Sequence, residues 1–165
     1  MKRIKLLLLL ILFSCYAHAQ ENSNDILNKL NGNWSAKGAA FGMPATITMS
    51  WLPALEGKFH QLNYKMLMTG KDGNLMVFEG AAFYKRLSEN SFTATWFDSQ
   101  GNMHPITASS DATTLTSLWG TPETQQGKTT YRFVSNNEVE VTDYVMKKDG
   151  TWSKFNQNTL ARDKD

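Results

Sequence analysis

The residues of this chain that could do chemistry are two histidines and a few acids. His60 and His104 lie in the body of the sequence, and Glu79, Asp98 and Asp143 are the acids whose positions bring them closest to an interior. A histidine with one or two carboxylates can bind a divalent metal or act as a general base. The spacing contains neither H-x-H nor H-E-x-x-H, the patterns typical of metal ligands. We therefore expect no metal site, with His104 exposed beside a turn.

Asp143 is the polar residue most at odds with its surroundings, because it lies between two valines at alternate positions. Burying an unpaired carboxylate costs several kcal/mol. If this face is internal, Asp143 should pair with Arg132 or Lys154, or bind a donor group of a ligand. Asp98 has a simpler interpretation, since an Asp followed by Ser-Gln-Gly is a turn former.

Motifs of nucleophilic catalysis and phosphate binding are missing from the sequence. The chain contains no G-x-S-x-G and no Walker loop, and Gly70-Lys71-Asp72-Gly73 has the composition of a hairpin turn. The sequence therefore favours a protein that is not an enzyme.

The first residues have the pattern of an export signal. Lys2-Arg3-Ile4-Lys5 is a positive n-region, and Leu6 to Phe13 is an apolar run too short to span a bilayer. Ala17-His18-Ala19 predicts cleavage after residue 19. Residues 1–19 are then a signal peptide and residues 20–165 one domain that is exported, either periplasmic or secreted.

The lone cysteine leaves a second interpretation open. Leu12-Phe13-Ser14-Cys15 also fits a lipobox, in which Cys15 is lipidated and holds the protein at a membrane. If the soluble form is made instead, no cysteine survives, and disulfides and thiolate catalysis are excluded. The net charge of +2 comes from the bases of the signal segment, so the remaining chain is near neutral. Such a chain has no electrostatic footprint for nucleic acid or for an anionic membrane.

The rest of the chain is typical of an antiparallel all-β domain after one short helix. The helix is expected at residues 24–31, with Ser23 or Asn24 as its cap and Asp25 in its first turn. Beyond it, apolar and polar residues alternate between regularly spaced turn residues. Ten strands are predicted, near 33–40, 45–52, 58–69, 74–86, 91–98, 102–109, 113–119, 128–135, 138–147 and 151–161. Consecutive hairpins of this number predict an up-and-down β-barrel with the helix over one end.

The same alternation assigns the side chains that would line the interior. A barrel of about eight to ten strands is wide enough for side chains alone or for one small ligand. Methionines are an adaptable lining for apolar ligands. The candidate cavity-lining residues are His60, Tyr64, Met66, Met68, Tyr84, Trp96, Trp119 and Asp143.

Several landmarks resemble those of known barrel families. Gly32-Asn33-Trp34 resembles the first signature of the lipocalins and related calycin barrels. In those barrels a basic residue near the end of the last strand packs over the tryptophan, and Arg162 matches this residue. Arg132 could also fill this role. Further residues are similar to the landmarks of a lipocalin-like family of exported bacterial domains of unknown function, which has W-x-D-x-x-G in the middle of the chain. Trp96 to Gly101 match this motif. The other matching residues are Trp51-Leu52, Gly57-Lys58-Phe59, Gly80, Tyr84 and Asp149-Gly150. The resemblance covers about residues 30–162. It implies a lipocalin-like barrel in which the Trp34 indole and the Arg162 guanidinium close one end, and it implies no reaction.

Nitrobindin-type barrels begin with a similar G-x-W-x-G-x-G stretch and bind haem through a late histidine. Here Ala36 replaces the middle glycine, and no histidine follows His104. We therefore expect no haem and no other cofactor.

Three functions remain open from the sequence. The first is a non-enzymatic binder of a small apolar or amphipathic molecule. The second is a hydrolase or isomerase that uses His60 with Asp143 or Glu79 inside the barrel, and the third is an interaction domain with a filled core. An interior that is hollow, and the polar groups that line it, would discriminate between them.

Overall fold

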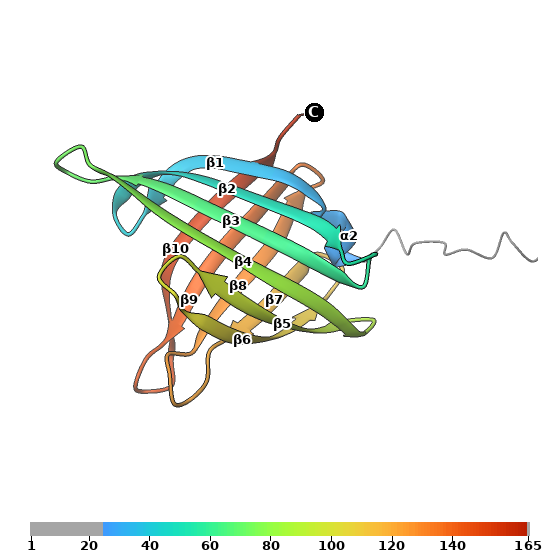
Figure 1. Ribbon diagram of the computed structural model, residues 1–165. Helices are drawn as coiled ribbons and strands as arrows, with labels where there is room; N and C mark the ends of the chain where they lie inside the picture. The colour runs from blue at the N-terminus through green and yellow to red at the C-terminus, as the bar shows by residue number, and fades with distance from the viewer. Residues whose placement is uncertain (1–24, 165) are drawn as a thin grey trace, which may run out of the picture.

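The computed structural model describes residues 25–164, which form a closed barrel of ten antiparallel strands with one short helix at its end (Figure 1). Each strand pairs with the next one in the sequence, and β1 pairs with β10 to close the ring. The predicted all-β up-and-down barrel is therefore confirmed. The predicted signal peptide, Cys15 and the cleavage site lie outside the described residues.

The strand positions follow the sequence prediction closely. They are β1 (Gly32–Ala40), β2 (Met43–Ala54), β3 (Phe59–Thr69), β4 (Leu75–Ser88), β5 (Ser91–Asp98), β6 (Met103–Ser110), β7 (Thr114–Trp119), β8 (Gly127–Ser135), β9 (Glu138–Met146) and β10 (Trp152–Arg162). Gly73, Gly101 and Gly150 have positive φ in the hairpins where turn chemistry was predicted. Local turn residues thus define the hairpins, because glycine adopts these angles without strain.

The helix α2 (Ile26–Leu30) is shorter than expected and begins at a different cap. Asp25 was predicted in the first turn, but it is the N-cap: its carboxylate accepts a hydrogen bond from the Leu27 amide at 3.1 Å. Ile26, Leu27 and Leu30 are buried, so the helix covers one end of the barrel.

A clamp on the carboxyl end of α2 holds the helix in place. The Trp34 indole donates to the carbonyl of Leu30 at 2.7 Å, and the Arg162 guanidinium donates to the carbonyls of Lys29 and Asn31. Arg162 Cζ lies 4.0 Å from the centre of the Trp34 ring, as the sequence resemblance implied. The last carbonyls of a helix have no intrahelical partner. Trp34 and Arg162 supply those partners from neighbouring positions of β1 and β10.

Gly32 makes the clamp possible. Its φ is 121°, which side-chain-bearing residues rarely adopt, and a Cβ there would lie 2.7 Å from Arg162 Nη1. The glycine of the G-x-W pattern therefore leaves space for the guanidinium.

The half of the barrel next to α2 is filled by side chains. Trp34, Phe92 and Val139 have no exposed surface in this core. Trp51 forms the boundary of the filled half, since its ring lies 5.1 Å from that of Tyr84 and 5.4 Å from that of Tyr131. Beyond these two tyrosines the interior is hollow.

Candidate ligand cavity

A cavity of about 220 Å³ occupies the half of the barrel away from α2. Its lining is mostly apolar and aromatic, with a small number of polar groups. The lining residues are Phe41, Tyr64, Met66, Phe78, Tyr84, Trp96, Asp98, His104, Ile106, Ser117, Trp119, Thr129, Tyr131, Val141, Asp143, Phe155 and Asn156. Tyr64, Met66, Tyr84, Trp96, Trp119 and Asp143 belong to the set chosen from the sequence.

Two glycines keep the cavity open. A Cβ on Gly80 would lie 2.0 Å from the Trp96 ring, and a Cβ on Gly127 would lie 1.9 Å from the Trp119 ring. Each indole therefore lies against the backbone of a neighbouring strand, where only glycine leaves room. Both indole rings line the cavity.

The other aromatic residues extend this wall. The rings of Tyr64, Phe78 and Trp96 lie 6.3 to 6.4 Å apart, centre to centre. These separations are within the range of favourable aromatic pairs. The result is a continuous aromatic surface along one side of the cavity.

Asp143 is the centre of the polar end of the cavity. Its carboxylate accepts hydrogen bonds from the Thr129 hydroxyl at 2.7 Å and from the Asn156 amide at 2.9 Å. The Trp119 indole in turn donates to the Thr129 hydroxyl oxygen at 3.2 Å. Burial raises the pKa of Asp143, and the two hydrogen bonds only partly offset this effect.

The prediction that Asp143 pairs with Arg132 or Lys154 is wrong. Arg132 pairs with Glu140, and the Lys154 ammonium donates to the Gln157 side chain. Strand register explains the difference, because the residues directly opposite Asp143 are Thr129 on β8 and Asn156 on β10.

Three tyrosines carry neutral hydroxyls in or beside this polar end. Tyr84 and the Ser117 hydroxyl lie 2.9 Å apart, and burial raises the pKa of Tyr84 to about 12. Burial also raises the pKa of Tyr64 and of Tyr131, and the negative charge of Asp143 adds to both shifts. These hydroxyls therefore stay protonated at neutral pH.

The histidines do not lie where the sequence analysis expected them. His104 lines the cavity, with its ring 5.7 Å from that of Trp119, rather than being exposed beside a turn. The turn ends before β6 begins at Met103, so the pleat turns His104 inward. His60 contacts α2 instead, where its Nε2 lies 3.1 Å from the Asn28 side-chain oxygen.

The catalytic combination considered from the sequence is not assembled. Glu79 was placed inside the barrel, but it faces outward and pairs with Lys65 at 2.8 Å. His60 and Met68 are absent from the cavity lining, which leaves Asp143 without the histidine proposed for it. The alternation of β4 explains this outcome, because the inward positions on either side of Glu79 belong to Phe78 and Gly80.

Asp98 both forms its predicted turn and lies at the cavity. Its carboxylate accepts hydrogen bonds from the backbone amides of Gln100 and Asn102 at 2.9 and 3.0 Å. Burial raises the pKa of Asp98, but the hydrogen bonds outweigh burial and leave the pKa lowered. Asp98 therefore carries a negative charge at neutral pH.

Phe41 and Phe155 cover the mouth of the cavity. Their rings stack with centres 5.9 Å apart, although both side chains are exposed. Phe155 is the extra residue of a β-bulge between Lys154 and Asn156, and Phe41 has a φ of 51°. Bulges and strained angles of this kind often occur next to binding sites.

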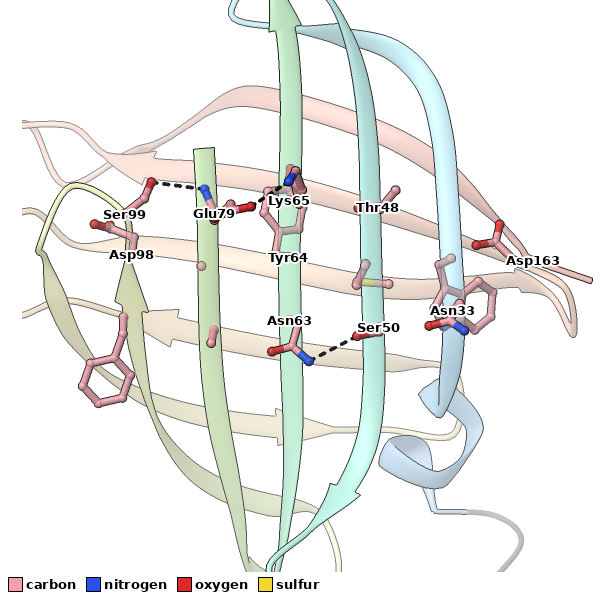
Figure 2. Close-up of a pocket in the computed structure, with 15 residues that line it drawn as sticks. Asn33, Thr48, Ser50, Asn63, Tyr64, Lys65, Glu79, Asp98, Ser99 and Asp163 are labelled. Atoms are coloured by element: carbon pink, nitrogen blue, oxygen red, sulfur yellow. Dashed lines mark hydrogen bonds and ion pairs between the residues drawn. The ribbon is translucent and has the colours of Figure 1, made fainter. Parts of the chain in front are cut away.

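A larger hollow of about 650 Å³ lies on the outer face of β1 to β5 (Figure 2). Four of its polar side chains are paired: Lys65 with Glu79, and Asn63 with Ser50 at 3.2 Å. The Ser99 hydroxyl accepts a hydrogen bond from the Glu79 amide. The groove is open to solvent and the ion pair within it joins two exposed side chains, so the interior cavity is the stronger candidate.

Residues 25–164 contain no group of three or more histidine, cysteine or acidic side chains placed to hold a metal ion. Within the same residues, no helix is both long enough and apolar enough to cross a membrane.

No protein-family model matches this chain, and a comparison with curated proteins finds no match. The closed ten-strand antiparallel barrel is compatible with a lipocalin-like barrel.

Proposed function

We propose that this protein is an exported, non-enzymatic binding protein of the lipocalin-like type, which holds one small amphipathic molecule inside its barrel. The observation that carries the proposal is the interior cavity. It has an aromatic wall along one side and a polar end where Asp143 is hydrogen-bonded to Thr129. Ligand pockets typically combine a largely apolar lining with a few placed polar groups. The G-x-W and W-x-D-x-x-G landmarks support the assignment to the exported lipocalin-like domains.

The cavity volume limits the ligand to a compact molecule. An apolar cavity of about 150 Å³ holds one benzene molecule. The volume of about 220 Å³ therefore suits a single substituted ring or a short branched chain. The Phe41 and Phe155 rings at the mouth would separate such a molecule from water.

Binding is tested by comparing a cavity-filling variant with a matched surface variant. Val141 lines the cavity and is 6% exposed, whereas Val77 is 51% exposed. We expect native mass spectrometry of the exported protein to show a retained small molecule. We also expect calorimetry to detect uptake of 2-phenylethanol, and V141F to lose both signals. V77F makes the same substitution outside the barrel and should keep them. Absence of both signals in the unmodified protein, or equal effects of the two variants, would contradict the proposal.

The proposed export is tested by the mass of the processed chain. Cleavage after Ala19 produces a soluble protein that begins at Gln20, whereas a lipidated Cys15 produces a heavier, membrane-bound form. Intact-mass analysis of the cell fractions distinguishes the two. A chain that retains residues 1–19 in the cytoplasm would contradict export.

A further inference from the structure

We infer that the ligand of this cavity is a small organic ammonium ion with a compact apolar body. The inference rests on the proposed binding function and identifies its ligand class. It is carried by three features: a buried carboxyl group without a cationic partner, two indole rings in the lining, and a lining that holds acidic side chains but no lysine or arginine among the described residues.

The first feature is the hydrogen bonding of Asp143, in which the side-chain neighbours act as donors. Thr129 receives the Trp119 N–H on its oxygen and directs its own hydroxyl proton to Asp143 Oδ1. Asn156 donates to Oδ2, and its own side-chain oxygen accepts from Asn158 at 2.9 Å. This arrangement solvates a carboxylate, and it leaves lone pairs on both oxygens for a further donor.

Asp143 has no cationic partner among the described residues. Among residues 25–164 the ion pairs are Lys65 with Glu79, Arg86 with Asp25, and Arg132 with Glu140. None of them involves Asp143. A buried carboxylate is normally paired with a cation or a metal. Because the described part of the chain provides neither, a cationic ligand group would complete the site.

The aromatic wall provides the second attraction for such a group. The Trp96 and Trp119 rings each lie against a glycine of a neighbouring strand and line the cavity. A cation over the face of an indole is attracted by the ring quadrupole, and tryptophan is the strongest of the aromatic residues in this interaction. The Trp119 ring also touches the polar end through its N–H. An ammonium ion bound near Asp143 would therefore have aromatic rings as neighbours.

The ionisable side chains of the lining are mainly acidic. Within the described residues, the lining includes two carboxylates, Asp98 and Asp143, and no lysine or arginine. Asp98 lies at the end of β5 beside a hairpin, so its charge attracts cations toward the open half of the barrel. An anionic ligand would be repelled by Asp98, whose pKa is lowered. An ammonium ion beside Asp143 would oppose the effect of burial and favour the charged form of its carboxyl group.

The test compares three probes that share a phenyl ring and differ in charge. 2-Phenylethylamine is a cation at neutral pH, 2-phenylethanol is neutral and 3-phenylpropionate is an anion. We expect calorimetry at neutral pH to show that the unmodified protein binds the amine at least about tenfold more tightly than the alcohol, with no measurable binding of the anion.

Two variants show whether Asp143 is responsible for this preference. D143N keeps the size of the side chain and removes its charge, so we expect the preference to disappear while the alcohol still binds. E89Q removes the same charge from the exposed Glu89 and should leave the preference unchanged. Thermal unfolding of both variants shows whether they are folded.

The outcomes separate this inference from the proposed function. If the alcohol or the anion binds as tightly as the amine, the ammonium inference is overturned and the binding function stands. If none of the probes binds and no molecule is retained, both are overturned. If E89Q reduces amine affinity as much as D143N does, the effect is one of overall charge, and the role assigned to Asp143 is wrong. Because the probe comparison uses the unmodified protein, it remains decisive even if D143N does not fold.

Discussion

Replacing Arg162 by alanine removes interactions that join the end of the last strand to the carboxyl end of α2 and to Trp34 of β1. These are two charged hydrogen bonds, to the carbonyls of Lys29 and Asn31, and the contact of the guanidinium with the Trp34 ring. Hydrogen bonds to a charged group contribute about 1.5–3 kcal/mol each. Arg162 is only half-buried, so the lower end of this range applies. We expect R162A to lower the free energy of unfolding by about 2–4 kcal/mol.

The double-mutant cycle with Trp34 isolates the contact between the two side chains. Trp34 is fully buried, and W34A should cost about 3–5 kcal/mol. The losses should not add, because both residues donate to carbonyls at the carboxyl end of α2 and touch each other. We expect a coupling energy of about 0.5–2 kcal/mol. R162K keeps the charge but lacks the planar guanidinium, which reaches both carbonyls in a fixed geometry and lies over the Trp34 ring. R162K should therefore destabilise the protein by less than R162A does.

Urea unfolding followed by tryptophan fluorescence measures these values. R132A is the matched control, because Arg132 forms an ion pair with Glu140 in which its side chain is 49% exposed. Such surface pairs contribute about 1 kcal/mol or less. The reasoning is refuted if R162A costs no more than R132A, or if the R162A and W34A losses add within about 0.3 kcal/mol.

Three further changes test the cavity. G80A places a Cβ 2.0 Å from the Trp96 ring and should force the ring into the cavity. The free energy of unfolding in urea should fall by about 1–3 kcal/mol. A crystal structure of G80A with an unchanged cavity would contradict this. The raised pKa of Asp143 means that folding favours its protonated form, so its stabilising effect is complete below its ordinary pKa of 3.8 and is lost as the pH rises through the folded pKa. D143N should therefore gain stability relative to the unmodified protein as the pH rises over that window, and a pH-independent difference would contradict this. F41N relieves the strain of the positive φ but removes the stacking on Phe155, so the free energy of unfolding should change by less than about 1 kcal/mol. Stopped-flow measurements should show faster ligand release, because the mouth of the cavity is no longer covered.

The residues with local signals were predicted well. Ten strands and their hairpins follow from period-two alternation and from turn glycines such as Gly73 and Gly150, which act within a few residues. Tyr64 and Trp96 were assigned to the interior for the same reason, since a side chain on a pleated strand has only two faces.

The failures concern strand register and the facing of single side chains. Asp143 was assigned a charged partner because the sequence shows composition but not register. The bulge at Phe155 brings Asn156 opposite Asp143, while Lys154 faces away. His104 was predicted to be exposed because it lies close to a turn, although it falls within the predicted strand 102–109, and it lines the cavity instead.

The sequence alone determined the fold class, the number of strands and most of the side chains that face inward, because each depends on neighbours a few positions apart. Only the tertiary structure decided that the barrel is hollow at one end. That outcome requires the Trp96 ring to lie against Gly80 and the Trp119 ring against Gly127, where a Cβ would leave no room. The register of neighbouring strands brings these pairs together, and it brings Thr129, Asp143 and Asn156 together from β8, β9 and β10. The alternation within one strand does not encode this register, because the register depends on the turns and bulges between paired strands.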